Sequence, residues 1–121
     1  MNVNIDIISF CKILTDLTNK DKCNWYPTSQ TSRDRLEFET GYIEIIQYKN
    51  LENSRKSYYI DIYNTRDDFR YPPFIAEKED EYEMYRIFGD LYKAIWAYYE
   101  RTRDKKINSF LTEILEQSSK K

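Results

Sequence analysis

The side chains that most often perform catalysis are missing or unpartnered in this chain. There is no histidine among its 121 residues, which removes the commonest acid–base group and metal ligand. A serine or cysteine nucleophile would have no imidazole to activate it. The two glycines, Gly41 and Gly89, are too few for a glycine-rich phosphate loop. We expect no enzymatic activity and no cofactor; the alternative is an enzyme that uses only carboxylates and tyrosine.

Carboxylates and thiols offer no metal site. The acidic run Ala76–Glu81 falls where a long helix is expected to begin, and negative charge is favourable near a helix N-terminus. We therefore interpret this run as solvated helix-capping charge. Cys11 and Cys23, without histidine, fit no zinc pattern. We expect two reduced thiols and no bound metal.

Tyrosine is the side chain most able to form a binding site here. The chain holds 12 Tyr, 2 Trp and 6 Phe, and Tyr and Trp are favoured where a surface must bind a partner. Alternation in a strand would place Tyr59, Asp61 and Tyr63 on one face, and Arg66 and Arg70 follow in the chain. These five residues are our candidate site for an anionic planar ligand held by stacking and arginine. The alternative is an ordinary exposed strand face with scattered surface charge.

Composition limits the class of partner. A chain of this length forms one domain, so we assign residues 1–121 to a single domain. Hydrophobic residues make up 40% and charged residues 33%, with a net charge of −2. This balance argues against general nucleic-acid binding, which needs a net basic face. No apolar run is long enough to span a membrane, and nothing resembles a signal peptide, so we expect a cytoplasmic protein.

The first half of the chain predicts one helix followed by short strands. Apolar residues recur every three or four positions over residues 4–18, which predicts an amphipathic helix with Asn4 as its N-cap. Trp25 is expected to fill the core between this helix and the sheet. Thr40-Gly41 breaks an alternating pattern and predicts a tight hairpin turn, with a bulged strand as the alternative. Strands are expected at Cys23–Tyr26, Arg35–Glu39, Tyr42–Tyr48 and Tyr58–Tyr63.

The second half predicts an edge strand and two helices. Phe69–Ile75 can be at most an edge strand, because Pro72-Pro73 cannot join a central ladder. A helical pattern runs from about residue 80 to 103, and residues 104–106 are expected to break or kink it. Residues 107–115 then form a short amphipathic closing helix. The predicted fold is therefore α+β, with three to five short antiparallel strands, an N-terminal helix, and a long C-terminal helix plus a short closing helix.

The long helix carries more aromatic residues than one sheet can cover. We expect a second buried surface on it, formed either by the closing helix or by a second subunit. Two-fold dimers are the commonest oligomers, so a homodimer or larger is expected. The candidate interface residues are Tyr85, Tyr92, Trp96 and Tyr99.

Several features follow one another along the chain: the opening helix, Asn24-Trp25, Phe38, Gly41–Ile45, Tyr58–Asn64, Leu91-Tyr92 and the closing helix. Taken in order, these features resemble a broad group of small bacterial and phage-encoded proteins. The resemblance covers about residues 5–115 and is one of pattern, without a diagnostic motif. It implies an accessory protein of a mobile element, and it assigns no functional residue. The chain departs from the pattern in lacking a glycine after Tyr63-Asn64 and in carrying Pro72-Pro73.

These observations favour a binding protein over an enzyme. The leading hypothesis is a phage or mobile-element protein that sequesters a host defence component, which would be either a protein or a nucleotide-like signal. A flat aromatic patch would favour the protein, and a deep aromatic–arginine pocket would favour the nucleotide. The alternative is an intracellular interaction module with no small ligand.

Overall fold

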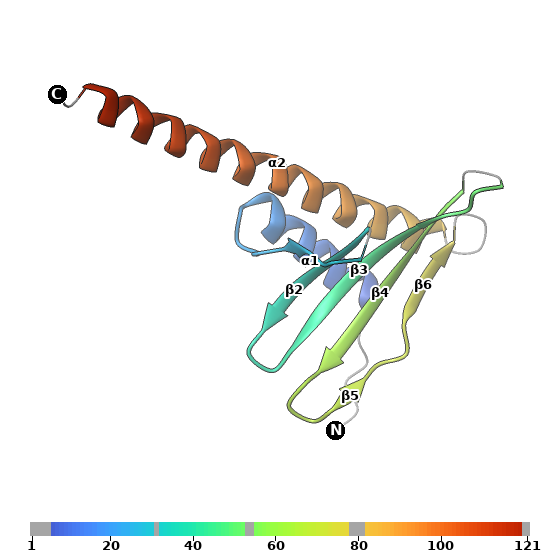
Figure 1. Cartoon of the computed structure of the whole chain (residues 1–121). Coiled ribbons are helices and arrows are strands. Elements are labelled where there is room, and N and C mark those ends of the chain that lie inside the picture. The colour runs from blue at the N-terminus through green and yellow to red at the C-terminus, as the bar shows by residue number, and fades with distance from the viewer. Residues whose placement is uncertain (1–5, 31, 53–54, 78–81, 120–121) are drawn as a thin grey trace.

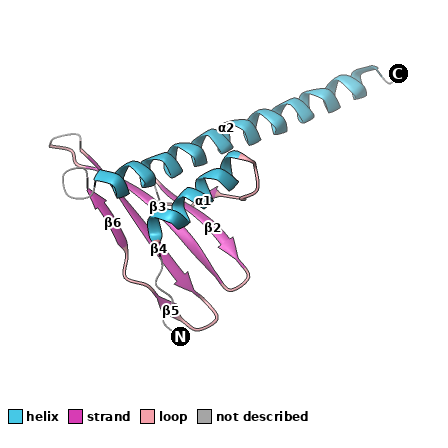
Figure 2. Ribbon diagram, turned by 180° about the vertical axis from the view of Figure 1, so that it is seen from behind, coloured by secondary structure: helices cyan, strands magenta, loops and turns pink. Residues whose placement is uncertain are grey.

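The fold is a six-stranded antiparallel sheet with both helices on one face. The computed structural model describes residues 6–30, 32–52, 55–77 and 82–119. Strands β1 to β4 are neighbours in chain order, and both β5 and β6 pair with β4. Figures 1 and 2 show α1 and α2 on the same side of the sheet. The elements are α1 (Ile7–Asn19), β1 (Tyr26–Pro27), β2 (Arg33–Phe38), β3 (Gly41–Lys49), β4 (Lys56–Asn64), β5 (Phe69–Arg70), β6 (Phe74–Glu77) and α2 (Tyr82–Ser119).

This architecture confirms the α+β prediction, but the described residues form six strands rather than three to five, and no separate closing helix. The predicted break at residues 104–106 is wrong, because α2 runs unbroken from Tyr82 to Ser119. The sequence changes the phase of its apolar stripe in this region, and we had interpreted that change as a break in the backbone. In the structure the helix continues and the stripe turns to another side of it. None of the described helices is long and apolar enough to cross a membrane.

The start of α1 is fixed by a carboxylate cap. Asp6 is the N-cap, and its Oδ1 accepts a hydrogen bond from the Ser9 backbone N–H at 3.2 Å. A cap of this kind satisfies one of the otherwise unpaired amides of the first turn. Asn4, the predicted cap, lies outside the described residues. The predicted amphipathic stripe is buried, with Cys11 and Leu14 in the core.

The β2–β3 hairpin confirms the predicted turn at Thr40. Phe38 pairs with Gly41, which leaves a two-residue loop between the strands. Gly41 is needed for close packing rather than for an unusual backbone angle. A Cβ at this position would lie 2.1 Å from the Tyr63 carbonyl oxygen on β4.

The core lies between the sheet and the two helices. Its fully buried side chains include Ile45 and Ile60 from the sheet and Phe88, Leu91 and Ile95 from α2. They belong to one apolar cluster, which also takes in Trp25 and the apolar face of α1. Burial of this face explains why α1 and the first half of α2 form helices in water.

The sheet edges are short, as the prolines require. Pro72-Pro73 separates β5 from β6, and both strands lie beside β4, so the predicted edge position of this segment is confirmed. On the opposite edge, β1 comprises only Tyr26–Pro27, which is shorter and later than the strand expected at residues 23–26. Ala76 and Glu77 belong to β6 rather than to a helix start, and residues 78–81 lie outside the described part.

Candidate functional site

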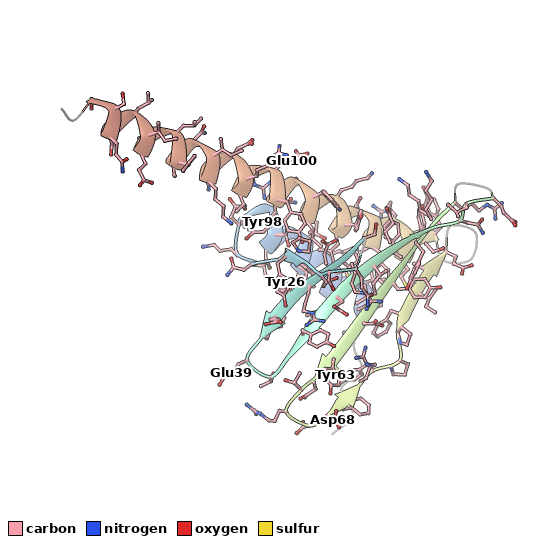
Figure 3. The ribbon with its side chains drawn as sticks, viewed as in Figure 1. Tyr26, Glu39, Tyr63, Asp68, Tyr98 and Glu100 are labelled. Carbon is pink, nitrogen blue, oxygen red and sulfur yellow. The ribbon has the colours of Figure 1, made fainter. Side chains whose placement is uncertain are left out.

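One face of the sheet is left uncovered by the helices, and the candidate site lies on it. Side chains alternate between the two faces of a strand, so the register of the sheet fixes which residues share this open face. Figure 3 shows the side chains of this face, with Tyr63 and Asp68 labelled at the far end of β4. The residues on the open face include Arg33, Arg35, Glu37, Tyr42, Glu44, Ile46, Tyr48, Tyr59, Asp61, Tyr63, Arg70 and Ile75.

Glu44 organises the centre of the open face. Its side chain is only 2% exposed although no helix covers it, because Arg33 and Arg35 lie across it. Arg33 Nη1 donates to Oε1 at 2.9 Å, and Arg35 Nε donates to Oε2 at 2.9 Å. Burial alone would lower the pKa of each arginine, but the hydrogen bond and attraction to Glu44 raise it. Charge-assisted bonds of this kind hold both guanidinium groups in fixed orientations.

Asp61 extends this network across the sheet. It lies opposite Glu44 on the neighbouring strand. Its Oδ2 is 3.7 Å from Arg33 Nη1 and 3.9 Å from Arg70 Nη1. Asp61 is therefore engaged by two arginines of its own chain, and a ligand would have to displace one of them to reach it.

Tyrosine rings fill the spaces between the charged groups. The guanidinium of Arg35 lies over the Tyr42 ring at 4.0 Å, and that of Arg70 lies 4.9 Å from the centre of the Tyr63 ring. Tyr42 and Tyr63 contact each other across β3 and β4, with ring centres 5.3 Å apart. Cation–π contacts attract the rings and the arginines to each other, so these side chains already have partners within the chain before any other protein binds.

Four of the five predicted ligand residues lie together on the open face. Tyr59, Asp61 and Tyr63 form the expected row on β4, and Arg70 on β5 pairs directly with Tyr63. Arg66 is exposed in the turn between β4 and β5, away from the Glu44 network. Whether this set binds a ligand stays a prediction.

Half of the open face was missing from the sequence prediction. The signal was present in the strand at residues 42–48, where Tyr42, Glu44 and Tyr48 alternate like the row on β4. It was overlooked because the same strand has a continuous apolar centre. Arg33 could not be assigned, because the predicted strand began only at Arg35.

The predicted dimer interface on α2 is mostly used within the chain. The Tyr58 ring lies 5.2 Å from Tyr85 and 5.7 Å from Tyr92, so both helix tyrosines pack on β4. Tyr99 donates a hydrogen bond to Asp34 at 2.8 Å. Of these four residues, Trp96 alone leaves about half of its surface, 47%, open to solvent. The sheet of the same chain therefore covers the additional aromatic residues of α2 for which we expected a closing helix or a second subunit.

Asp34 and Tyr99 form a buried polar pair on the covered face. Asp34 is 2% exposed, and its Oδ2 has no hydrogen-bond partner among the described residues. Burial raises the pKa of Asp34, and the hydrogen bond from Tyr99 partly offsets this rise. Burial also raises the pKa of Tyr99, and its bond to Asp34 raises it further. We assign this pair to attachment of α2 to β2, because it lies away from the open face.

Both cysteines lie in the core. Cys11 and Cys23 are buried and unbridged, and burial raises the pKa of Cys11 to about 12. The described part of the chain contains no cluster of three or more residues able to hold a metal ion.

The arginines of the open face are neutralised by the carboxylates between them. Arg33 and Arg35 share Glu44, Arg35 also lies 3.6 Å from Glu37, and Arg70 faces Asp61, so three carboxylates balance three arginines. An anionic ligand needs positive charge that no carboxylate already balances, whereas a partner protein can replace these ion pairs with ion pairs to its own charged side chains.

No family model, curated protein or solved structure matches the chain. The resemblance to phage accessory proteins therefore stays a prediction from pattern.

Proposed function

We propose that this chain is a non-catalytic binding protein whose open sheet face docks onto a partner protein. The observation that carries the proposal is the ordered network of arginine, tyrosine and carboxylate around Glu44 on a face that no helix covers. Tyr and Arg are the side chains enriched at energetically important interface positions. Here they are held in place by their own chain, which reduces the entropy lost on binding.

The proposed partner is a host protein, and the proposed role is sequestration of a defence component by an accessory protein of a phage or mobile element. Capture needs a shaped surface and no reaction. The residues proposed to contact the partner directly are Tyr48 and Tyr59, whose rings lie 4.7 Å apart edge to face, together with Tyr63. The arginines position these rings and supply the polar rim.

The test compares two matched tyrosine variants. Tyr48→Ala/Tyr59→Ala removes two rings from the open face, and Tyr82→Ala removes a 72% exposed ring from α2, on the other side of the molecule. Each variant is used as bait in bacterial lysates, and the recovered protein is then purified and titrated by calorimetry. We expect affinity to fall at least tenfold for the double variant and to stay unchanged for Tyr82→Ala.

A nucleotide-like ligand is the second candidate, and a thermal-shift screen with nucleotides and cyclic dinucleotides tests it. Tyr59 and Tyr63 lie on one face of β4 and are partly exposed, which is the observation in its favour. We expect no shift, because the nearby arginines are already paired. A stabilisation that Tyr63→Ala abolishes would replace the protein partner by a nucleotide.

A further inference from the structure

The second half of α2 presents an apolar stripe that the other described residues leave largely open to solvent. Every residue from 104 to 119 is exposed, and Figures 1 and 2 show this part of the helix extending beyond the body of the molecule. Five large apolar side chains here are 46–69% exposed. They recur at spacings of three and four, which places them on one side of the helix. This distal stripe consists of Ile107, Phe110, Leu111, Ile114 and Leu115.

The distal stripe does not continue the face by which α2 packs on the body. The packed face is set by residues such as Ile87, Leu91 and Ile95. At about 100° per residue, the centre of the distal stripe is rotated roughly 150° from that face. The body of the same chain therefore cannot cover the stripe by any small bend of the helix.

Trp96 lies on the same side of α2 as the distal stripe. It precedes Ile114 by about five helical turns and therefore points in the same direction. Beside it, a cleft of about 390 Å³ opens between α2 and the ends of β3 and β4, lined by Gln47, Lys56, Tyr58, Trp96 and Glu100. Glu100 and Arg103 lie on this side between Trp96 and Ile107, and both are exposed, so charged side chains separate Trp96 from the distal stripe.

The charges beside the stripe indicate which occupant fits it. Lys106 and Glu113 lie on the same flank of the stripe, two turns apart. Neither makes an ion pair with another residue of the described chain. If a second α2 lies antiparallel on the stripe, Lys106 faces Glu113 of the other copy, and the two-fold axis repeats the contact. In a parallel pair this flank would lie on opposite sides of the interface in the two copies, so neither Lys106 nor Glu113 would meet an opposite charge.

The size of the stripe fits a weak pair. A large side chain presents about 200 Å², so five that are half exposed bury roughly 1,000 Å² in total when two copies meet, close to the lower limit for a specific interface. The geometry points to a homodimer in which the distal halves of two α2 helices pack antiparallel, with Ile107 opposite Phe110 of the other copy. This inference does not depend on the proposed function, and the arrangement leaves both open sheet faces accessible.

Sedimentation equilibrium of the full chain from low to high micromolar concentration tests the proposal. We expect reversible dimerisation in the wild type and a loss of at least tenfold in affinity for Phe110→Glu. Thr112→Glu adds the same charge two residues later, on the opposite side of the helix, and should leave dimerisation unchanged. Residues 110 and 112 lie beyond the body, so both variants should fold.

A charge exchange tests the antiparallel arrangement. Lys106→Glu and Glu113→Lys should each weaken the dimer several-fold. The double variant should restore the affinity, because the two residues are too far apart to pair within one helix and can pair only between copies.

Hydrogen exchange supplies an independent readout: amides of residues 107–119 should gain protection as the protein concentration rises. A protein that stays monomeric at high micromolar concentration would overturn the proposal. The same holds if that monomer instead binds anionic lipid vesicles through the distal stripe. A dimer that survives Phe110→Glu, or a double charge variant without rescue, would also overturn it.

Discussion

At the scale of single residues, stability depends on a few buried side chains that link separate elements. Trp25 is 4% exposed, and its Nε1 donates to Thr18 Oγ1 at 2.9 Å. Thr18 in turn donates to the Leu14 carbonyl at 2.6 Å. The predicted core role of Trp25 is confirmed: its ring closes the end of α1, and its indole N–H satisfies a buried threonine.

Trp25→Ala should lower the free energy of unfolding by about 3–5 kcal/mol, the range for large aromatic truncations in cores. The chain supplies its own control in Trp96, which is 47% exposed; Trp96→Ala should cost about 1 kcal/mol or less. Urea unfolding followed by circular dichroism measures both. Equal losses for the two tryptophans would contradict the core assignment.

Tyr99→Phe should lower the free energy of unfolding by about 1–3 kcal/mol, because it leaves the buried Asp34 carboxyl without its hydrogen-bond donor. Urea unfolding measures this loss.

The free energy of unfolding should also depend on pH, because the pKa of Asp34 is raised in the folded state. A carboxyl that binds its proton more tightly in the folded state adds stability below its unfolded pKa of about 4. That stability is lost as pH rises through the folded pKa.

Asp34→Asn isolates this titration. Its stability relative to the wild type should improve as pH rises from about 3 to 7, because the asparagine has no buried charge to form. Urea unfolding at each pH gives the difference. A difference that does not change with pH would show that Asp34 titrates alike in both states.

At the scale of elements, α2 has two halves with different roles. The first half contributes Phe88, Leu91 and Ile95 to the core, whereas none of residues 104–119 is buried. A helix without tertiary contacts is marginal in water. The distal half thus extends a helix that the first half nucleates, and its stripe is available for a partner.

Ser109→Pro should separate these roles. Proline costs about 3 kcal/mol or more in a helix interior, but here only the distal half should unfold. We expect a loss of helical circular dichroism at low micromolar concentration with the melting temperature of the body unchanged. Ala94→Pro, in the buried half, should prevent folding. A large drop in melting temperature for Ser109→Pro would mean that the distal half supports the body.

At the scale of the whole molecule, a single core joins the helices to the sheet. Cys11 and Cys23 belong to that core and are 0% and 6% exposed. The sheet keeps its other face open, so core and candidate binding surface lie on opposite sides of the same strands. Substitutions on the open face can therefore change binding with little effect on folding.

Both thiols should react with Ellman's reagent only through unfolding. The thiolate is the reactive form, and burial raises the pKa of Cys11 to about 12 and also that of Cys23. Native protein should be labelled at its unfolding rate, and Trp25→Ala should accelerate both sites together. Fast labelling of one thiol in the native state would indicate local opening near α1.

The sequence alone determined the local structure and the fold class. Alternation in Tyr58–Tyr63 and helical spacing in residues 4–18 depend on backbone geometry, which acts over a few residues. For the same reason, the row Tyr59, Asp61 and Tyr63 could be assigned to one face. The prolines at positions 72 and 73 set the sheet edge, because a missing N–H excludes a central position whatever surrounds it.

Only the tertiary structure decided which faces are covered. The β2–β3 register places Arg33 and Arg35 on Glu44, and no local pattern encodes contacts across strands. Tyr85, Tyr92 and Tyr99 were assigned to a second subunit because a sequence does not show how far the sheet reaches around α2. The phase change near residue 104 is equally compatible with a helix break and with a straight helix whose stripe turns away. The packing of the first half of α2 against the sheet and α1 decides in favour of the continuous helix. The same packing leaves the distal stripe exposed.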